Sequence, residues 1–468
     1  MQNELFVNLI KGDRVDSRVD YRDALPHNML PVLRPVLGVA GYMWEQPGLA
    51  SFATGVGNDR GGVYNERQNS HFRQSSTTFI EVSQTGVVTN LGTVLGLEPV
   101  SMPYSFNTQA IIGGGDYYLY DTTNGFREIT DPQVGNPIDG VWIAGVYMFT
   151  DGETLYRTDF NDEETIDPTR FITSEFSPDP TKGLGVTPDS KVIAFNRYTT
   201  EYLAINAAVD FGFTWIPSRS TKYGLVATHA KCEIGGTWYF LGGPKEGSLS
   251  VYELVVGNAR EIASRSVTQL LTAYNEDDLT NTVMESRLYE EYSQIILHLP
   301  NETLIYSIEV GQQLGKEWAW CELTSPNNVQ WRAIHGIFEP RVGSYIYGDK
   351  STADIGQLDP TLATQYGDKI ECRLQIPFVY LERASIDELE IETIPGFTMT
   401  DDASVFFSMT YDGINFSQEE LIQYGGPGEF GQRFMAYALG DVNNYFSYRL
   451  RWVSASRMAF SRATIRYL

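Results

Sequence analysis

The stretch EYSQIILHLPNETLIYSIEV, residues 291–310, is the clearest hairpin signal in the chain and decides the fold class. Residues 295–299 form one β-prone run that is apolar except for His298, and residues 304–306 begin a second. The four polar residues between the two runs, Pro-Asn-Glu-Thr, have the composition and the length of a hairpin turn. The stretch therefore predicts two antiparallel strands joined by a short loop.

Similar hairpins recur along the chain. In GVYMFTDGETLYRTDF, residues 145–160, the pair Asp151-Gly152 is one of the strongest short hairpin signals. Seven such units are anchored by buried-type residues, namely Phe79, Tyr117, Tyr147, Phe195, Tyr239, Ile296 and Tyr345. Their separations of 38, 30, 48, 44, 57 and 49 residues centre near the ~40–50 residues of a propeller blade. We therefore predict an all-β fold built on a six- or seven-bladed β-propeller, while a β-solenoid or a set of sandwiches stays open as an alternative.

Two segments depart from the hairpin pattern. Residues 266–286 carry apolar residues at helical spacing and predict a short helical insertion. From residue 363 to 468, longer alternating strands predict a C-terminal β-sandwich-like domain. We accordingly divide the chain into a propeller with an N-terminal arm, residues 1–362, and a sandwich, residues 363–468. The strand near Met29 is our candidate for the one that closes the propeller.

Composition excludes several classes of function. The chain has 468 residues and a formal net charge of −25, and such an acidic surface repels nucleic-acid phosphates instead of binding them. The three cysteines, Cys232, Cys321 and Cys372, form no disulfide or zinc pattern, so we expect buried thiols. No apolar run reaches the ~18 residues of a membrane helix, and the N-terminus lacks a signal-peptide pattern. We expect a soluble protein that is made in the cytoplasm and does not insert into membranes.

No catalytic, metal or cofactor site emerges from the motifs. The five histidines are His27, His71, His229, His298 and His335, and none has the close spacing of two ligands on one metal. We expect His298 to be a hydrogen-bonded structural residue of its strand. The acidic segment 159–167 lacks the ligand spacing of a calcium loop and is expected to be a solvated loop.

The segment TYDGINFS, residues 410–417, supports a second class of function. Asp412, Gly413 and Phe416 match the Asp-box hairpin of sialidase-like propellers, although Asp-Gly is also what a tight hairpin requires in any fold. A glycan-binding or glycoside-hydrolysing β-propeller protein is therefore the alternative to a structural role.

The order of elements from residue 266 to residue 375 resembles the packaged-DNA stabilisation, or tail hub and nozzle, proteins of short-tailed phages. The resemblance rests on a helix ending near Tyr274, the hairpin closing on Leu299-Pro300, Gly348-Asp349 and the stretch IGQLD at 355–359. GYMWEQPGLASF near the N-terminus and YRLRWVSASRMAFSRATIRYL at the C-terminus also match. These are structural elements, so the resemblance transfers no catalytic residue.

The resemblance implies a structural virion protein of the tail. Such proteins form hexameric rings below the portal and the head-to-tail adaptor, extend the DNA channel, retain packaged DNA, and carry tailspikes or fibres and a needle. Double-stranded DNA would then pass through the lumen without sequence-specific binding. We expect acidic loops to face that lumen or an interface, and the candidates are Asp162, Glu163, Glu164, Glu276, Asp277 and Asp278.

Overall fold

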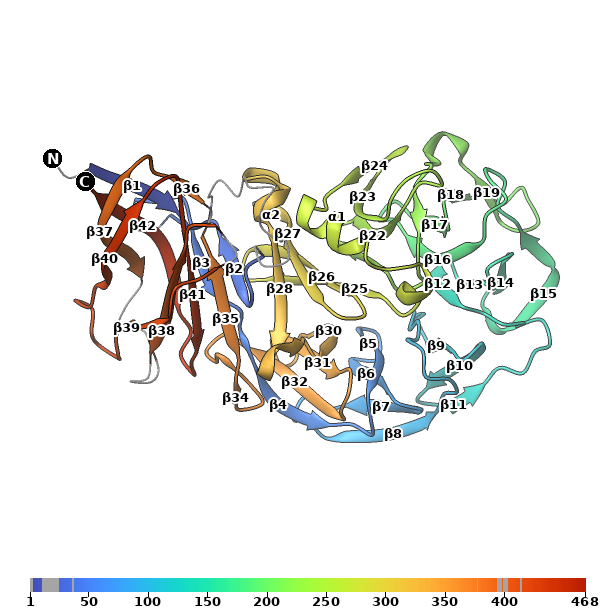
Figure 1. Cartoon of the computed structure of the whole chain (residues 1–468). Coiled ribbons are helices and arrows are strands. Elements are labelled where there is room, and N and C mark those ends of the chain that lie inside the picture. Colours follow the sequence, from blue (N-terminus) through green and yellow to red (C-terminus); the bar gives the residue numbers. More distant parts are fainter. Residues whose placement is uncertain are drawn as a thin grey trace.

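The computed structural model describes residues 3–10, 25–35, 38–376, 378–393, 398, 403–412 and 415–468. Seven small sheets are arranged around one axis, and two further sheets pack face to face beside them (Figure 1). The fold is thus a seven-bladed β-propeller with a C-terminal β-sandwich, as the hairpin pattern predicts.

Each blade is an antiparallel meander, because consecutive strands joined by short turns pair with one another. Blade 1 consists of β5 (Asp59–Asn65), β6 (Ser70–Ser75), β7 (Thr78–Val82) and β8 (Val88–Thr93), and blade 2 consists of β9 (Gln109–Gly113), β10 (Asp116–Asp121) and β11 (Gly125–Glu128). Blade 3 consists of β12 (Asp139–Ile143), β13 (Val146–Thr150), β14 (Leu155–Asp159) and β15 (Asp162–Ile172). Blade 4 consists of β16 (Thr181–Val186), β17 (Lys191–Asn196), β18 (Thr200–Ile205) and β19 (Phe213–Trp215).

Blades 5 to 7 follow the same plan with extra short strands. Blade 5 consists of β20 (Gly224–Leu225), β21 (Lys231–Ile234), β22 (Thr237–Gly243), β23 (Ser250–Val255) and β24 (Asn258–Glu261). Blade 6 consists of β25 (Val283–Tyr289), β26 (Tyr292–His298), β27 (Thr303–Ser307), β28 (Trp320–Ser325) and β29 (Val329–Gln330). Blade 7 consists of β30 (Ala333–Glu339), β31 (Ser344–Asp349) and β32 (Asp354–Asp359), and is completed by β4 (Gly48–Thr54), β33 (Thr364–Gln365) and β34 (Asp368–Lys369).

The seven anchor residues fall in seven different blades. Phe79 lies on β7, and the other six lie on β10, β13, β17, β22, β26 and β31. The first strands of neighbouring blades contact one another, for example β12 with β16 and β30 with β5, so the sheets close into a ring. A ring of this kind excludes the solenoid and the set of sandwiches.

Blade 2 contains an irregular inner strand. Ser101 and Tyr104 form isolated bridges with Ile112 and Gln109 of β9. The backbone segment that contains them therefore takes the innermost position, and β9 to β11 are the second to fourth strands. The prolines at positions 99 and 103 explain the irregularity, since proline cannot donate to a ladder.

The propeller is closed by β4, which pairs with β32 from Gly48↔Asp359 to Thr54↔Asp354. The prediction that the strand near Met29 closes the ring is wrong. Met29 begins β2 (Met29–Val32), which pairs with β3 (Tyr42–Glu45), and β3 pairs with the last strand of the chain. Residues 29–32 and 48–54 are both short apolar stretches, so only the strand pairing shows which of them closes the ring.

The predicted helical insertion is present. Helix α1 (Arg265–Leu271) begins at Ser264, whose side chain accepts a hydrogen bond from the backbone N–H of Val267. A short 3-10 helix, η3 (Asp277–Leu279), follows it. The sequence analysis missed a second helix, α2 (Ile308–Gln313), which interrupts the run after β27.

The sandwich draws strands from both ends of the chain. One sheet contains β1 (Asn3–Asn8), β2, β3, β37 (Ala384–Thr393), β40 (Phe434–Val442) and β42 (Ala459–Tyr467), and the other contains β35 (Glu371–Gln375), β36 (Val379–Tyr380), β38 (Ser404–Thr410), β39 (Glu420–Gln423) and β41 (Tyr445–Val453). The N-terminal strand β1 pairs with β42 along its whole length. The division of domains at residue 362 stays a prediction.

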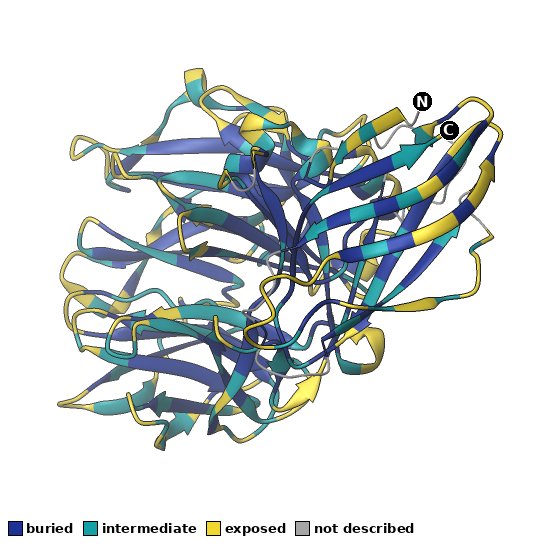
Figure 2. Ribbon diagram, turned by 90° about the vertical axis from the view of Figure 1, so that its left-hand side faces the viewer, coloured by how far each residue is buried: buried dark blue, intermediate teal, exposed yellow. Residues whose placement is uncertain are grey.

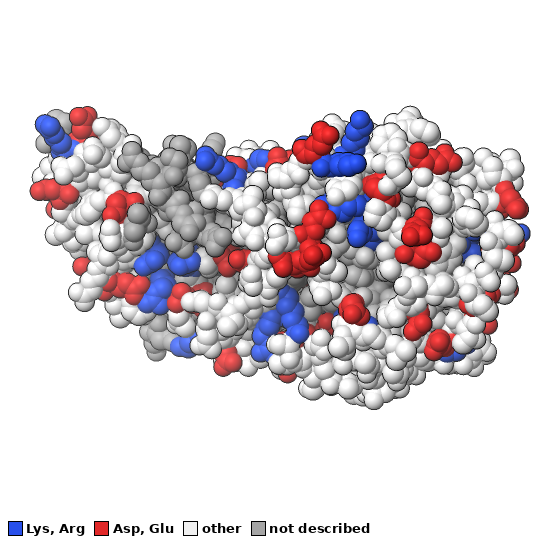
Figure 3. All heavy atoms as spheres, turned by 45° about the vertical axis from the view of Figure 1, so that its right-hand side comes forward, with Lys and Arg blue, Asp and Glu red and all other residues white. Residues whose placement is uncertain are grey.

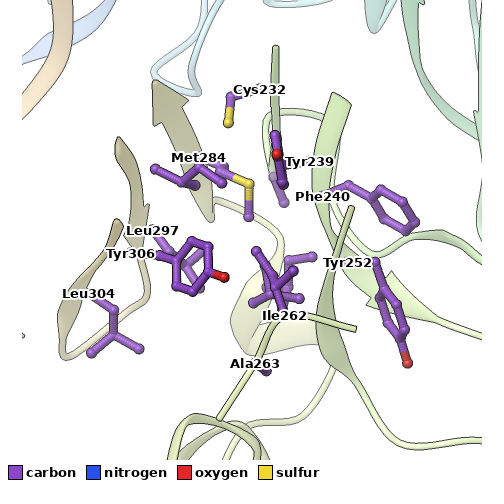
Figure 4. Packing of buried hydrophobic residues seen from close by; sticks show 14 of the residues in the cluster. Cys232, Tyr239, Phe240, Tyr252, Ile262, Ala263, Met284, Leu297, Leu304 and Tyr306 are labelled. Atoms are coloured by element: carbon purple, nitrogen blue, oxygen red, sulfur yellow. The ribbon is translucent and has the colours of Figure 1, made fainter. Parts of the chain in front are cut away.

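Apolar clusters fill the spaces between neighbouring sheets, and buried positions alternate with exposed ones along the sandwich strands (Figure 2). In the largest cluster, Tyr239 and Phe240 of blade 5 and Leu297 and Leu304 of blade 6 lie on either side of Met284 (Figure 4). The three cysteines are buried thiols, as predicted, and none of them forms a disulfide.

Candidate functional site: a polar belt and a cavity at the propeller axis

His298 is the last residue of β26, the second strand of blade 6. Its Nε2 is 3.1 Å from Oε1 of Glu285, which lies on the neighbouring strand β25. Its ring stacks against the buried indole of Trp331, with the ring planes 4° apart. Burial lowers the pKa of His298 to about 4, and the nearby Lys350 adds to this effect. The imidazole is therefore neutral at neutral pH and lies beside a buried carboxylate.

Blades 1 and 7 are joined by a second group of buried charges. Nε of Arg73 donates to Asp59 at 2.7 Å, and the other carboxylate oxygen of Asp59 lies 2.8 Å from Nδ1 of His335. Burial alone would raise the pKa of Asp59, but Arg73 and His335 together outweigh burial and hold that pKa below its usual value. The guanidinium of Arg73 also donates to the carbonyl oxygens of Ile346 and His335. A buried charge pair with this many partners fixes the geometry of both blades.

The remaining blades meet at Asp139, on the first strand of blade 3. Its carboxylate accepts hydrogen bonds from the Ser101 hydroxyl of blade 2, the Leu184 N–H of blade 4 and the Lys231 ammonium of blade 5. Between blades 6 and 7, Oε2 of Glu285 accepts the Gly336 N–H at 2.8 Å. These polar contacts form a belt around the axis, in which buried charged side chains bind groups of neighbouring blades. The belt consists of Asp59, Arg73, Asp139, Glu285, His298 and His335 with their partners.

A cavity of about 360 Å³ lies at the end of the axis where blades 1, 6 and 7 meet. It is lined by Asn58, Asp59, Arg60, Leu97, Pro99, Asp278, Asn281, Thr282, Val283, His298, Leu299, Pro300, Gln330, Ile334, His335 and Lys350. Two histidines, a lysine, an arginine and two carboxylates therefore line one space. No group of three or more His, Cys, Asp or Glu side chains in the described ranges is arranged to hold a metal ion.

The first acidic candidate segment lies at the outer edge of blade 3. Asp162, Glu163 and Glu164 begin strand β15, so the prediction of a solvated loop over residues 159–167 is wrong. Glu163 accepts a hydrogen bond from the Thr108 hydroxyl at 2.6 Å, and Glu164 pairs with Arg127 at 2.7 Å. Two of the three carboxylates therefore attach this strand to blade 2.

The second acidic segment is the short helix η3 and its N-cap. Glu276, the N-cap residue, forms an ion pair with Arg197 of blade 4. Asp277 is exposed, and Asp278 accepts the Asn275 N–H at 2.9 Å and lines the axial cavity. The two segments lie on different blades, and no contact joins them in the described part of the chain.

Comparison with known proteins gives the family. A family model described as bacteriophage P22 Gp10, β-propeller, matches residues 6–363, and a second, bacteriophage P22 Gp10, β-sandwich, matches residues 371–467. The chain belongs to the bacteriophage P22 Gp10 family. It is a structural tail hub protein, a component of the phage tail, and the resemblance inferred from the sequence is confirmed. The glycan-binding or glycosidase alternative is not favoured.

The match to a curated relative extends from end to end. The tail hub protein is 28% identical to the tail hub protein gp10 of Salmonella phage P22, over 98% of each chain. Solved structures similar to it include the Pan2 WD40 domain of Neurospora crassa (TM-score 0.41, 8% identity, 67% of this chain and 95% of that one). Another is virginiamycin B lyase from Staphylococcus aureus (TM-score 0.40, 10% identity, 77% and 99%).

Further features of the tail hub protein bear on the sequence analysis. Among the described residues, no helix has the length and apolar character needed to cross a bilayer. Gly413 of the Asp-box-like segment lies outside those residues, and Asp412 accepts the Asn415 N–H at 2.8 Å, as a turn residue does. The face in Figure 3 carries acidic and basic side chains interspersed, not separated into two regions.

The sequence analysis missed the belt, although part of the signal was present. The predicted hairpin of β26 extends to β25, and that pairing alone places Glu285 diagonally opposite His298. By contrast, Asp59 and His335 are 276 residues apart and meet only because the ring closes.

Proposed function

We propose that copies of this tail hub protein form a ring that extends the DNA channel below the portal and its head-to-tail adaptor. The supporting observation is the end-to-end match to the P22 tail hub protein, which includes both the propeller and the sandwich. Six copies are proposed. The ring would retain packaged DNA and offer attachment sites for tailspikes or fibres and for a needle, after assembly in the cytoplasm of the bacterial host.

The acidic charge of the chain supports passage of DNA without adhesion. With a net charge of −25, a lumen lined by this chain repels phosphates and lets double-stranded DNA slide. Of the six candidate residues, Glu164 and Glu276 are neutralised by arginines, and Glu163 is held by Thr108. We therefore place the lumen or interface role first on Asp162, Asp277 and Asp278, which form no ion pair with a described residue.

A structural role without catalysis is the second part of the proposal. The buried histidines and carboxylates of the axis are engaged with one another and with backbone groups of neighbouring blades. Such contacts stabilise a rigid wall, which is what a channel under the pressure of packaged DNA requires.

The proposal is tested by native mass spectrometry of the purified protein, alone and mixed with the portal–adaptor complex of the same phage. We expect six copies of the tail hub protein on each adaptor ring. A preparation of the protein without adaptor serves as the control. Failure to form any complex at micromolar concentrations would contradict the proposed place in the tail.

A further inference from the structure

The axial cavity contains a cation without a matching anion. Lys350 follows β31 and lines the cavity, and its ammonium group donates to the Thr303 hydroxyl at 3.1 Å. No carboxylate among the described residues forms an ion pair with it. A partly buried amine in such a place is costly unless a negative charge offsets it.

The carboxylates near Lys350 are already engaged. Glu285 is held by His298 and by the Gly336 N–H, and Asp59 is held by Arg73 and His335. Asp349, the residue before Lys350, pairs with Arg332 and accepts the backbone N–H of Ser351. Burial lowers the pKa of Lys350 to about 7, so an anion bound beside it would favour the charged form of the amine.

A second observation points to a missing ligand. The Thr282 residue lines the same cavity, is 2% exposed, and its hydroxyl oxygen has no hydrogen-bond partner among the described residues. Buried hydroxyl groups without a partner are rare in native proteins, because each costs about 1–3 kcal/mol. His335, whose Nδ1 lies 2.8 Å from Asp59, lines the same cavity.

We propose that the axial cavity is a binding site for a small oxyanion, with a carboxylate or phosphate group bound by Lys350. The lining side chains fit this chemistry, since Lys350 is accompanied by Arg60, whose guanidinium donates to backbone carbonyls, and by hydroxyl, amide and imidazole groups. Asp278 on η3 is the unpaired carboxylate of the lining and limits the affinity by repulsion. A bound anion would link blades 1, 6 and 7 at the point where the ring closes. This site goes beyond the tail hub function and does not depend on it.

The test uses the full-length protein and its thermal unfolding temperature. Phosphate, and separately acetate, is titrated against sodium chloride at equal ionic strength, because ions also stabilise proteins non-specifically. In the wild type we expect a rise in Tm that saturates at millimolar phosphate or acetate. If only one of the two anions gives a saturable rise in Tm, its group, phosphate or carboxylate, is the one that the cavity binds. In the Lys350→Gln variant we expect the saturable rise in Tm to be lost. The control variant Lys245→Gln, changed on an exposed loop, should retain that rise.

Two further results decide the proposal. Asp278→Asn is expected to saturate at a lower anion concentration than the wild type, because it removes the repelling charge. If Lys350→Gln does not fold, reductive ¹³C-methylation of wild-type lysines gives the same answer, since one methyl signal should move with the anion. The proposal is overturned if no anion gives a saturable change, or if Lys350→Gln responds as the wild type does.

Discussion

At the scale of the residue, Glu45 has an unusual environment. It is fully buried, and one of its carboxylate oxygens, Oε2, accepts both the Trp452 indole N–H and the Met458 backbone N–H, each at 3.1 Å. The other oxygen, Oε1, has no hydrogen-bond partner among the described residues. Burial raises the pKa of Glu45 from 4.5 to about 7. Between these two pH values, the Glu45 side chain is therefore protonated in the native state and ionised in the unfolded chain.

Glu45→Gln is therefore expected to stabilise the protein at alkaline pH. The amide oxygen of the glutamine can replace Oε2 as the acceptor of the two N–H groups. The amide nitrogen then replaces Oε1, which accepts no hydrogen bond from a described residue in the wild type. Because the wild-type pKa is raised from 4.5 to about 7, wild-type stability falls as pH rises through that window. Urea unfolding at pH 8 should show a gain on the order of 2–3 kcal/mol, which disappears at pH 4. A loss of stability at pH 8 would contradict this account of Glu45.

Three histidines change the stability in the opposite direction as pH falls. Burial lowers the pKa of His71, His229 and His298 to about 4 each, against 6.5 in an unfolded chain. Between these two values the unfolded state binds more protons, so the free energy of unfolding falls as pH drops from 6.5 to 4.

His298→Gln should reduce this acid sensitivity while lowering stability at pH 7. At neutral pH the variant loses the contact with Glu285 and the stacking on Trp331. Chemical unfolding from pH 7 to pH 4 should then show a smaller fall than in the wild type. A wild type with constant stability over this range would contradict the assigned burial of the histidines.

At the scale of the element, the closing strand β4 is the structural feature that most distinguishes the ring from an open array of hairpins. It joins residues 48–54 to β32, about 300 positions later in the chain. Leu49 on this strand is 1% exposed and packs in a cluster with Trp331 and Tyr347 of blade 7.

Leu49→Ala is expected to cost about 2–5 kcal/mol of the free energy of unfolding, as for other buried leucines. Urea unfolding followed by tryptophan fluorescence measures it, and Leu421→Ala, an exposed leucine on β39, is the matched control. Equal midpoints for the two variants would show that β4 does not hold the ring closed.

Elements with a local cause could be predicted from the sequence. The hairpin turn at 300–303, the Asp151-Gly152 turn and helix α1 follow from residues near one another, and all are present. The identity of the closing strand, the irregular inner strand of blade 2 and the pairing of Asp59 with His335 depend on contacts across the closed ring. Local pattern carries no information about such contacts, so these parts of the fold and of the axial site needed the structure.

At the scale of the whole molecule, the charge makes a direct prediction about DNA. A chain with net charge −25, whose basic and acidic groups are interspersed on the face shown in Figure 3, should not bind double-stranded DNA even at low salt. A gel-shift assay at 50 mM salt with linear DNA should show free DNA at micromolar protein. Retardation that weakens steeply with added salt would reveal a basic site and contradict the repelling lumen.

The two ends of the chain meet in the sandwich, where β1 pairs with β42, while the propeller closes separately through β4. The molecule is thus held together at two places, the sandwich and the closing strand of the propeller. The central claim is that such subunits form a ring on the tail.

Electron microscopy of the protein mixed with its portal–adaptor complex tests that claim most directly. The account predicts a six-fold ring of propeller and sandwich densities below the adaptor, with an open channel along the axis of the ring. Single subunits that leave the adaptor bare, at concentrations where the adaptor itself is assembled, would contradict it.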